Sequence, residues 1–448
     1  MFLLLEIVKA INGILWGIVL VVVLVGCGII FTFYLRGIQI RKFGKAFKQV
    51  FGGFTLKGEK AGAEGMSSFQ SLATAIAAQV GTGNLAGAAT AIVSGGPGAI
   101  FWMWLSAFFG MATIFSEAVL AQLFKKEKDG EVTGGPAYYL KYGLKSDFLA
   151  KFFAVTIILA LGFIGNMVQA NSIGSAFSSA FNINPLIVGI LLAIVSGFVF
   201  IGGISRIASL TEKLVPIMAG FYVIGGVIIL VLMGSNTLDA IRMIFVGAFN
   251  PSAVLGGAAG VMVKDAIRYG VARGLFSNEA GMGSTPHAHA VAKVDNPVHQ
   301  GLAAIVGVFI DTFIVLNITA LVIISTGANL SGETGIAVTQ KAFEIGFGHF
   351  GLIFVAVSLL FFAFSTIVGW YFFAEANIKF LFGSKGLTPF RIIVLIFIVI
   401  GTTQKVELVW ELADMFNGIM VIPNVIGLIG LAKMVKSTLD KAEKNNLI

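Results

Sequence analysis

Long blocks of apolar residues are the feature that most constrains the fold of this chain. A helix needs about 20 predominantly apolar residues to cross the hydrocarbon core of a bilayer, and several of the blocks reach that length. Because lipid offers the backbone no hydrogen-bonding partner, such segments are expected to be helical. Hydrophobic residues make up 57% of the 448 residues and charged residues only 12%, which excludes an ordinary water-soluble domain. We predict an all-α integral membrane protein.

The apolar blocks predict eleven transmembrane helices. We place them near residues 11–35, 65–93, 99–124, 148–181, 185–203, 212–233, 253–284, 300–326, 350–382, 389–404 and 409–435. The weakest block is the tenth, because it opens with Pro389 and Arg391 and is barely long enough to cross. It is retained because, without it, the lysines at the end of the chain would lie on the side that carries few other positive charges.

Lysine and arginine lie mostly on one side of the membrane in this arrangement. The connecting segments on that side carry 23 of these residues, and the other side carries only Lys9, Arg242, Lys341 and Lys405. Since cytoplasmic loops carry the excess of positive charge, we expect the N-terminus outside and the C-terminus inside the plasma (cytoplasmic) membrane. A net charge of +8 can indicate a nucleic-acid partner, but in a membrane protein the location of the positive charges is the informative property, so we expect no nucleic-acid partner.

The region around the first span contains two features that need interpretation. Leu24-Val25-Gly26-Cys27 resembles the lipidation box of bacterial lipoproteins, but a retained helix is favoured because the apolar run continues through Tyr34. Basic and aromatic residues are interleaved from Ile38 to Phe51, which predicts an amphipathic helix on the inner membrane surface. Cys27 is the single cysteine, so no intrachain disulfide can form.

The second apolar block is interrupted at Gly81-Thr82-Gly83-Asn84. Two glycines lower the cost of breaking a helix, and the backbone groups freed by a break need polar partners that hydrocarbon does not supply. A polar ligand or an ion can be that partner. The alternative is that these small residues only let helices pack closely. The polar side chains of Gln79 and Asn84 favour a binding site.

The seventh block has the same character, within Gly270–Ser284. The two broken helices head consecutive groups of five spans, which predicts one five-helix repeat over 61–240 and a second over 241–435. Five crossings per repeat place the two repeats in opposite orientations. Residues 1–60 add one helix and the interfacial helix, and residues 436–448 form a cytoplasmic tail. Paired broken helices in inverted repeats are typical of secondary transporters, whose binding site lies near the middle of the membrane.

Three motifs resemble those of the sodium/alanine symporter family, also called the alanine/glycine:cation symporters. They are Gly81-Thr82-Gly83-Asn84, Phe276-Ser277-Asn278-Glu279-Ala280-Gly281 and Gly95-Gly96-Pro97-Gly98-Ala99-Ile100-Phe101-Trp102-Met103-Trp104, with Gly110 beyond. The resemblance covers nearly the whole chain. It implies membership of the amino acid-polyamine-cation superfamily, a fold similar to that of the bacterial leucine transporter with one helix before a ten-helix core, and sodium-driven uptake of alanine and glycine.

The resemblance also implies ligands for a co-transported sodium ion. The carbonyls of Ala77 and Val80 in the second span would join the carbonyl of Phe362 and the hydroxyls of Ser365 and Thr366 in the ninth span. Oxygen ligands suit a hard cation. The alternative for the two hydroxyls is a hydrogen bond to a carbonyl of their own helix, which is common in membrane helices.

The substrate is placed beside the same break by the resemblance. The backbone amides of Gly81-Thr82-Gly83 would face its carboxylate at the start of a half-helix, where the helix dipole favours an anion. Gln79 and Thr366 would border the pocket. Trp370 lies one turn beyond Thr366 and would fill the pocket floor, leaving room only for a small side chain.

Other polar residues of the spans are open to two interpretations. Where the seventh span unwinds is not fixed, so its substrate contacts are drawn from Gly270, Gly274, Phe276 and Ser277. In the fourth span, Asn166 and Gln169 either face the pocket or bond across a helix interface. Charged residues are either structural ion pairs or gating and ion-binding groups, namely Lys264, Asp265, Arg268, Glu117, Asp311 and Glu375.

Metal-site and enzyme functions are not favoured by the sequence. His287-Ala288-His289 has no cysteine or carboxylate at ligand spacing. Catalytic and nucleotide-binding motifs are absent, and the longest predicted loop, 125–147, is too short for an enzyme domain. The alternatives to sodium-coupled symport are proton-coupled amino acid transport and an ion channel, although neither a charged ring nor a carbonyl filter is visible. We expect a monomer whose partners are an amino acid, sodium and the lipid bilayer.

Overall fold

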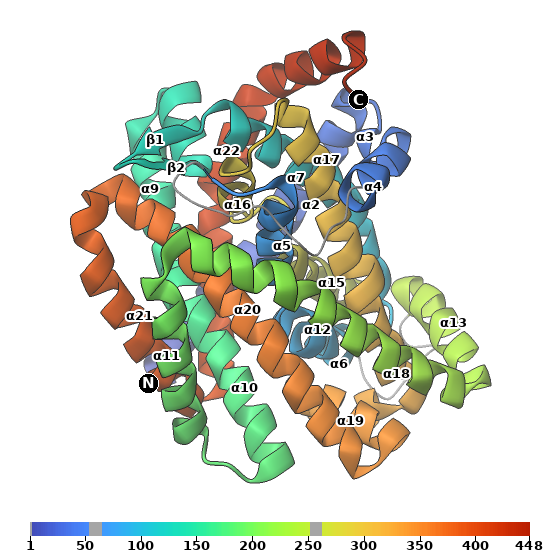
Figure 1. Ribbon diagram of the computed structural model, residues 1–448. Coiled ribbons are helices and arrows are strands. Elements are labelled where there is room, and N and C mark those ends of the chain that lie inside the picture. The colour runs from blue at the N-terminus through green and yellow to red at the C-terminus, as the bar shows by residue number, and fades with distance from the viewer. Residues whose placement is uncertain (1, 53–64, 251–261) are drawn as a thin grey trace.

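The computed structural model describes residues 2–52, 65–250 and 262–448, and these are almost entirely helical (Figure 1). Within these ranges, strands β1 (Lys126–Lys128) and β2 (Glu131–Thr133) form a short antiparallel hairpin. The all-α class is confirmed. The start of the predicted seventh span, 253–261, and the predicted boundary at residues 60 and 61 lie outside the described residues.

The helices run through the whole described chain. The first half contains α1 (Phe2–Ile14), η1 (Leu15–Val19), α2 (Leu20–Tyr34), α3 (Ile38–Arg41), α4 (Phe43–Phe51), α5 (Ser68–Gln79), η2 (Gly83–Gly87), α6 (Ala88–Gly95), α7 (Ala99–Leu123), α8 (Pro136–Tyr138), η3 (Tyr139–Gly143), α9 (Asp147–Ile157), η4 (Ile158–Gly165), α10 (Asn166–Phe181), α11 (Pro185–Ile201) and α12 (Gly203–Met233). The second half contains α13 (Ser235–Phe249), α15 (Val263–Asn278), α16 (Pro286–Ala290), α17 (Pro297–Val308), η5 (Phe309–Leu316), α18 (Asn317–Thr326), η6 (Ala328–Leu330), α19 (Ile336–Phe347), α20 (His349–Phe382), η7 (Gly383–Gly386), α21 (Leu387–Thr403) and α22 (Val406–Lys444). Of these, η1 to η5 are π-helical turns, which are frequent at functional sites.

The length and surface of these helices are those of a multi-pass membrane protein. Seven helical stretches among the described residues are long and apolar enough to cross a membrane, or eight if α5 and the bent continuation through α6 count as one span. Apolar side chains cover the outer surface, and Ile194, Phe198 and Val231 are each more than 60% exposed. Such a surface suits lipid. Each predicted apolar block lies mainly on helix where it is described, and the count of eleven crossings stays a prediction.

Several helices differ from the predicted blocks. α13 and α19 have 15 and 12 residues, too few to span a bilayer, so a search for long apolar blocks does not find them. α12 begins at Gly203 rather than at residue 212, and α22 continues to Lys444 through most of the predicted tail. Lysine and glutamate near the start of α12 and at the end of α22 lower the mean hydropathy of these segments, but both residues favour helix. The predicted boundary between the repeats, after Ala240, falls inside α13.

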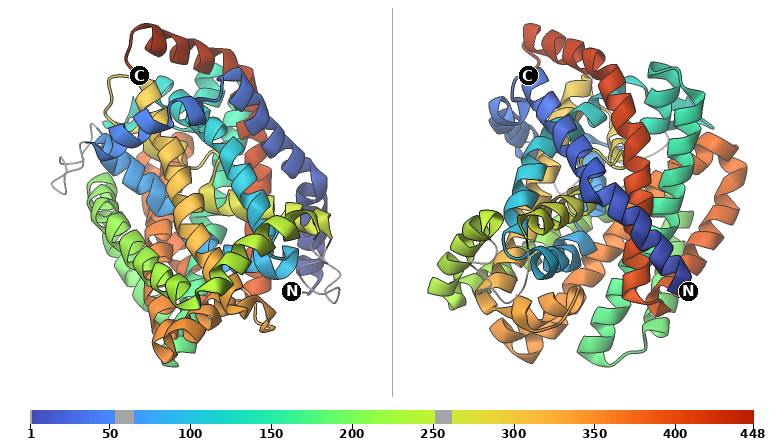
Figure 2. Two further views of the ribbon diagram at one scale, coloured as in Figure 1. Left: turned by 90° about the vertical axis from the view of Figure 1, so that its right-hand side faces the viewer. Right: turned by 180° about the vertical axis from the view of Figure 1, so that it is seen from behind.

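Segments predicted to share one side of the membrane gather at one end of the molecule. Arg36 and Arg41 each lie 2.8 Å from Glu443, so the segment after α2 contacts the last helix. Asp129 in the hairpin accepts hydrogen bonds from Ser384 after α20, and these bonds hold the pKa of Asp129 below its usual value. The beginning of α1 lies at the opposite end from the C-terminus (Figure 2). An odd number of crossings requires this separation.

The two interrupted helices occupy the interior of the bundle. α5 packs against α12, α17 and α20, whereas α15 packs against α6 and α7. A capping box starts α5, because the Ser67 hydroxyl accepts from the Gln70 amide and the Gln70 side chain accepts from the Ser67 amide. From Gln70 to Gln79 every residue of α5 is buried. The polar groups of the break are thereby kept away from lipid.

Candidate functional site

The interruption predicted in the second block is confirmed. α5 ends at Gln79, and Val80 has an extended backbone with φ −82° and ψ 90°. Helical structure resumes at Gly83, and the two parts meet at 45°. Because a helix end leaves carbonyls without intrahelical partners, the carbonyls of Ala77 and Val80 become available at this point.

The seventh block is also interrupted, but later than Gly270 and Gly274. α15 continues as a regular helix to Asn278, and Glu279 then adopts the left-handed conformation with φ 59°. Gly281 and Gly283 have φ of 89° and 83°, a region that favours glycine. The break is therefore built by the residues between α15 and α16.

Gly270 and Gly274 lie on the face of α15 that packs against α7. A Cβ atom at Gly270 would lie 2.5 Å from the Ala99 carbonyl oxygen, and one at Gly274 would lie 3.0 Å from the Ser106 hydroxyl. These glycines permit close packing of two helices, as small residues commonly do in membranes. The structure places the break, which the sequence left open, after these glycines, so of the four candidate contacts Gly270 and Gly274 lie in regular helix.

Five oxygen atoms from α5 and α20 converge beside the first break. The Thr366 hydroxyl lies 3.0 Å from the Ala77 carbonyl, 3.4 Å from that of Val80 and 3.0 Å from that of Phe362. The Ser365 hydroxyl lies 3.2 Å from the Ala77 carbonyl and 2.8 Å from that of Phe362. Both hydroxyl residues are fully buried. The structure thus brings together the five residues that the family resemblance implies as sodium ligands.

The oxygen cluster has fewer hydrogen-bond donors than acceptors. Each hydroxyl has one hydrogen to donate, so two hydrogens face three carbonyl oxygens. Both hydroxyls lie within hydrogen-bonding distance of the Phe362 carbonyl of their own helix. A hydroxyl hydrogen donated to Phe362 is not available to the carbonyls of Ala77 and Val80. A hard cation can accept electron pairs from all five oxygens at once. The donor set therefore fits an alkali cation.

The backbone amides at the break are engaged by side chains. Gly81 N–H donates to Asn84 Oδ1 over 2.9 Å, and Thr82 N–H donates to Gln169 Oε1 over 3.1 Å. A Cβ atom at Gly81 would lie 2.3 Å from the Thr366 hydroxyl oxygen, so only glycine fits there. Gln169 from α10 therefore reaches the predicted substrate position. Its amide oxygen stands where an oxygen of a carboxylate would accept the same hydrogen bond.

The two breaks are joined directly and through η5. Gln79 donates to the Asn278 carbonyl over 2.7 Å, and a Cβ atom at Gly83 would lie 2.8 Å from the Ser277 Cα atom. The Asp311 carboxylate accepts from Asn84 over 2.7 Å and from the Ser277 hydroxyl over 3.0 Å. The two breaks are therefore in direct contact and share the Asp311 carboxylate.

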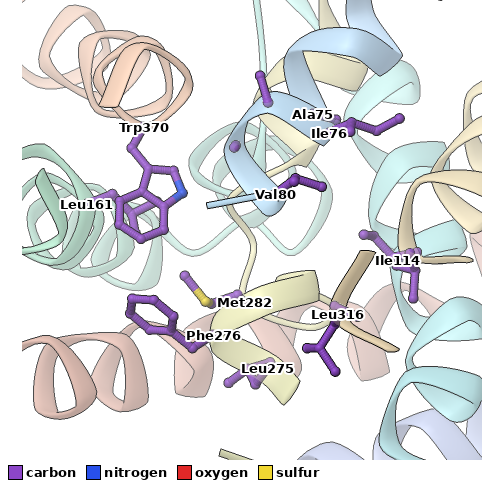
Figure 3. Close-up of a cluster of buried hydrophobic side chains, with 14 of the residues drawn as sticks. Ala75, Ile76, Val80, Ile114, Leu161, Leu275, Phe276, Met282, Leu316 and Trp370 are labelled. Carbon is purple, nitrogen blue, oxygen red and sulfur yellow. The ribbon is translucent and has the colours of Figure 1, made fainter. Parts of the chain in front are cut away.

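Trp370 closes the site from α20. It is 1% exposed, and its indole N–H donates to Glu279 Oε1 over 2.5 Å. Its ring meets that of Phe276 edge to face, with centroids 5.7 Å apart. Figure 3 shows both rings on the same side of Val80, with Met282 beside Phe276. The predicted residue Trp370 thus contacts the second break.

Other candidate residues have structural partners. The Asn166 amide donates to the Gly162 carbonyl of its own helix over 3.1 Å. Glu117 accepts from the amides of Gly281 and Gly283 over 3.1 and 2.9 Å, so it fixes the chain after the second break. These contacts hold the scaffold around the site.

The remaining charged candidates lie away from both breaks. Glu375 lies 3.1 Å from Lys379, which makes an ion pair near one end of α20. Asp265 accepts from the Met262 amide and caps α15. Arg268 lies over the Tyr269 ring at 5.4 Å. None of these contacts reaches the oxygen cluster.

Comparison with known proteins decides the family. The sequence model of the sodium:alanine symporter family matches residues 1–446. The chain belongs to this family. It is 43% identical over 442 residues to the sodium/alanine symporter AgcS of Methanococcus maripaludis, covering 96% of each chain. It is 41% identical over 406 residues to the amino-acid carrier protein AlsT of Bacillus subtilis, covering 90% of this chain and 85% of the relative.

A further relative has a name with a different substrate. The chain is 41% identical over 438 residues to the "Probable sodium/glutamine symporter GlnT" of Bacillus subtilis, covering 97% of this chain and 90% of the relative. Sodium:alanine symporters are membrane transport proteins for amino acids and not enzymes. The family resemblance stated from three motifs is confirmed.

Two carboxylates of this symporter were missed or left open by the sequence analysis. Glu279 was given no role, yet it is fully buried and contacts both Trp370 and Ser284. Asp311 was left ambiguous, yet it joins the two breaks. The signal in both cases was a carboxylate inside an apolar block, which is costly and therefore functional by default.

Proposed function

We propose that the protein couples the uptake of alanine and glycine to inward movement of sodium by alternating access. The observation that carries this proposal is the convergence of five oxygen atoms from α5 and α20 at the first break. An inward-moving cation releases about 2.3 kcal/mol per 100 mV of membrane potential, before any concentration gradient. A carrier that binds both solutes together can use this energy to concentrate the amino acid.

The coupling follows from ligands that belong to two helices. A sodium ion at the cluster would hold the end of α5 against Ser365 and Thr366 of α20. The amides of Gly81 and Thr82 lie next to these ligands and would bind the substrate carboxylate in place of the Asn84 and Gln169 oxygens. Sodium and substrate would then favour the same arrangement of the break, so each would raise the affinity for the other.

The membrane arrangement that we propose has eleven crossings and two inverted five-helix repeats. Its support is the presence of an interrupted helix in each predicted repeat, α5–α6 and α15–α16. The location of the two chain ends at opposite ends of the molecule agrees with an odd count (Figure 2). Alternating access would move one set of helices against the other around the two breaks.

Proton coupling is a second candidate, favoured by Glu279 and Asp311. Both are fully buried, and their hydrogen-bonding partners, among them Trp370 and Asn84, are neutral. A carboxylate in a dry interior must be protonated or paired with a cation. Either group can therefore carry a proton through the transport cycle.

Uptake into proteoliposomes separates these functions. Purified protein should accumulate labelled alanine when sodium is higher outside, with saturation in both alanine and sodium. Replacing sodium by potassium at constant pH should abolish accumulation. Accumulation driven equally well by an inward proton gradient without sodium would favour the second candidate, and non-saturable flux would favour a channel.

The sidedness of the chain ends gives a direct prediction. Single cysteines introduced as Leu3→Cys and Asn445→Cys, each with Cys27→Ser, should react differently with an impermeant thiol reagent on intact cells. Only the N-terminal cysteine should be labelled, because the segments that gather near the C-terminus carry the excess of positive charge. Permeabilised cells provide the control, in which both should react. Labelling of the tail from outside would refute an odd number of crossings with the C-terminus inside.

Trp370 is expected to set the upper limit on substrate size. Trp370→Leu removes the indole from the site and its hydrogen bond to Glu279, so alanine should bind several-fold more weakly while larger amino acids gain relative to it. Competition by glutamine, leucine and methionine against labelled alanine uptake measures this change. Trp410→Leu is the control, since Trp410 also contacts Phe276 but lies on α22. Unchanged exclusion of leucine in Trp370→Leu would show that Trp370 does not bound the pocket.

A further inference from the structure

An apolar cavity lies between α4, α5, α12 and η5, and none of the five residues of the oxygen cluster lines it. Its volume is about 370 Å³, within the usual range for small-molecule sites. Every residue that lines it is apolar, including Phe51, Leu72, Ile76, Pro216, Gly220 and Ile314. Water in such a cavity would have no polar partner. The lining therefore suits hydrocarbon.

The cavity connects the interfacial helix with the broken helix. Phe51 at one end belongs to α4, the helix predicted to lie on the membrane surface. Ile76 at the other end directly precedes Ala77, whose carbonyl belongs to the oxygen cluster. The cavity thus extends along α5 from the helix predicted to lie on the membrane surface to the residue that precedes the oxygen cluster.

Two exposed lysines lie one helical turn from residues that line this cavity. Lys48 is one turn before Phe51 on α4, and Lys213 is one turn before Pro216 on α12, so each shares a helix face with a lining residue. Both are exposed, and within the described parts of the chain neither pairs with a carboxylate. Glu212 is next to Lys213 in the sequence, but its side chain is buried and its carboxylate accepts a hydrogen bond from the Gln70 side chain. The exposed charged side chains beside this end of the cavity are thus the two lysines, whereas the carboxylate of Glu212 is buried.

We propose that this cavity binds one anionic phospholipid, with an acyl chain in the cavity and the headgroup phosphate at Lys48 and Lys213. The apolar lining accounts for the chain, and the two exposed lysines account for the negative headgroup. The bound chain packs against Leu72 and Ile76, so it supports α5 in the position that forms the oxygen cluster. The inner location of the headgroup rests on the proposed topology, whereas the binding itself does not.

Filling the cavity tests the acyl-chain part of the proposal. Gly220 lines the cavity, and a Cβ atom there meets nothing within 4 Å, so Gly220→Phe projects a ring into the space without displacing backbone. Gly26→Phe is the matched control, because Gly26 on α2 is equally open but distant from the cavity. Native mass spectrometry of the delipidated, purified protein should show one tight phosphatidylglycerol in wild type and in the control, and about tenfold weaker binding in Gly220→Phe. Gly220→Leu should give a smaller decrease in phosphatidylglycerol binding. It replaces Gly220→Phe in the test if the phenylalanine variant folds poorly.

The headgroup part is tested by charge. Lys48→Gln and Lys213→Gln should each weaken phosphatidylglycerol binding about fivefold, while Lys145→Gln, an exposed lysine elsewhere, should not. Phosphatidylcholine should bind weakly to all of these variants. Three results would each overturn the proposal. They are equal binding of the two lipids, unaltered binding in Gly220→Phe, and the absence of a tightly bound lipid in wild type. Since no measurement uses transport, failure here is independent of failure of sodium-coupled symport.

Discussion

Removing both hydroxyls of the oxygen cluster, Ser365→Ala with Thr366→Ala, should raise the sodium concentration for half-maximal alanine uptake by at least about tenfold, since about 1.4 kcal/mol of lost cation binding already gives that factor. The change deletes two of five converging oxygens and leaves the three carbonyls of Ala77, Val80 and Phe362 in place. Uptake as a function of external sodium, at saturating alanine, measures it.

Two variants control this experiment. Ser358→Ala removes another buried hydroxyl from α20 at a distance from the break and should leave the sodium curve unchanged. Thr366→Ser keeps an oxygen at the cluster and should behave closer to wild type than Thr366→Ala. If the double alanine variant retains the wild-type sodium curve, the cluster does not bind the transported cation.

The second large effect is expected at a buried ion pair. Arg273 on α15 and Asp414 on α22 are joined by two hydrogen bonds of 2.6 and 2.7 Å, and both residues are less than 10% exposed. Asp414→Ala leaves the guanidinium buried without its partner, which typically costs about 3–5 kcal/mol. The melting temperature of the purified protein should fall accordingly.

A double variant tests whether the loss of stability comes from the unpaired charge. Arg273→Met with Asp414→Leu removes both charges and should recover much of the lost stability, because apolar replacements of buried ion pairs are often tolerated. Glu407→Gln breaks the exposed Lys9–Glu407 pair on the same helix and should change the melting temperature little. A melting temperature for Asp414→Ala equal to that of wild type would show that the pair does not stabilise the bundle.

The first helix break could be predicted from the sequence because its signal is local. Gly-Thr-Gly-Asn in an apolar block indicates a broken helix on steric and solvation grounds alone, and the structure has the break there. Ser365 and Thr366 were tied to Ala77 and Val80 only by family resemblance, since no pattern in one chain predicts which distant helix faces a break. Their contact in the fold is therefore the more informative result.

Predictions were left open or missed where a local signal has two meanings. Glycines at 270 and 274 resemble a break, but they serve contact between α15 and α7, a fact that depends on the neighbouring helix. Gln169 was left open between two roles and Glu279 was given none, because the partner that each side chain contacts is set by tertiary packing. α13 and α19 are too short to be recognised by hydropathy.

The central claim, that sodium and alanine bind together at the break in α5, is tested most directly by equilibrium binding. Labelled alanine should bind the purified protein at least about tenfold more tightly in saturating sodium than in potassium at the same ionic strength and pH, and alanine should tighten sodium binding by the same factor. Ser365→Ala with Thr366→Ala should lose most of this difference, whereas Ser358→Ala should keep it. An alanine affinity that is equal in sodium and potassium would contradict the account.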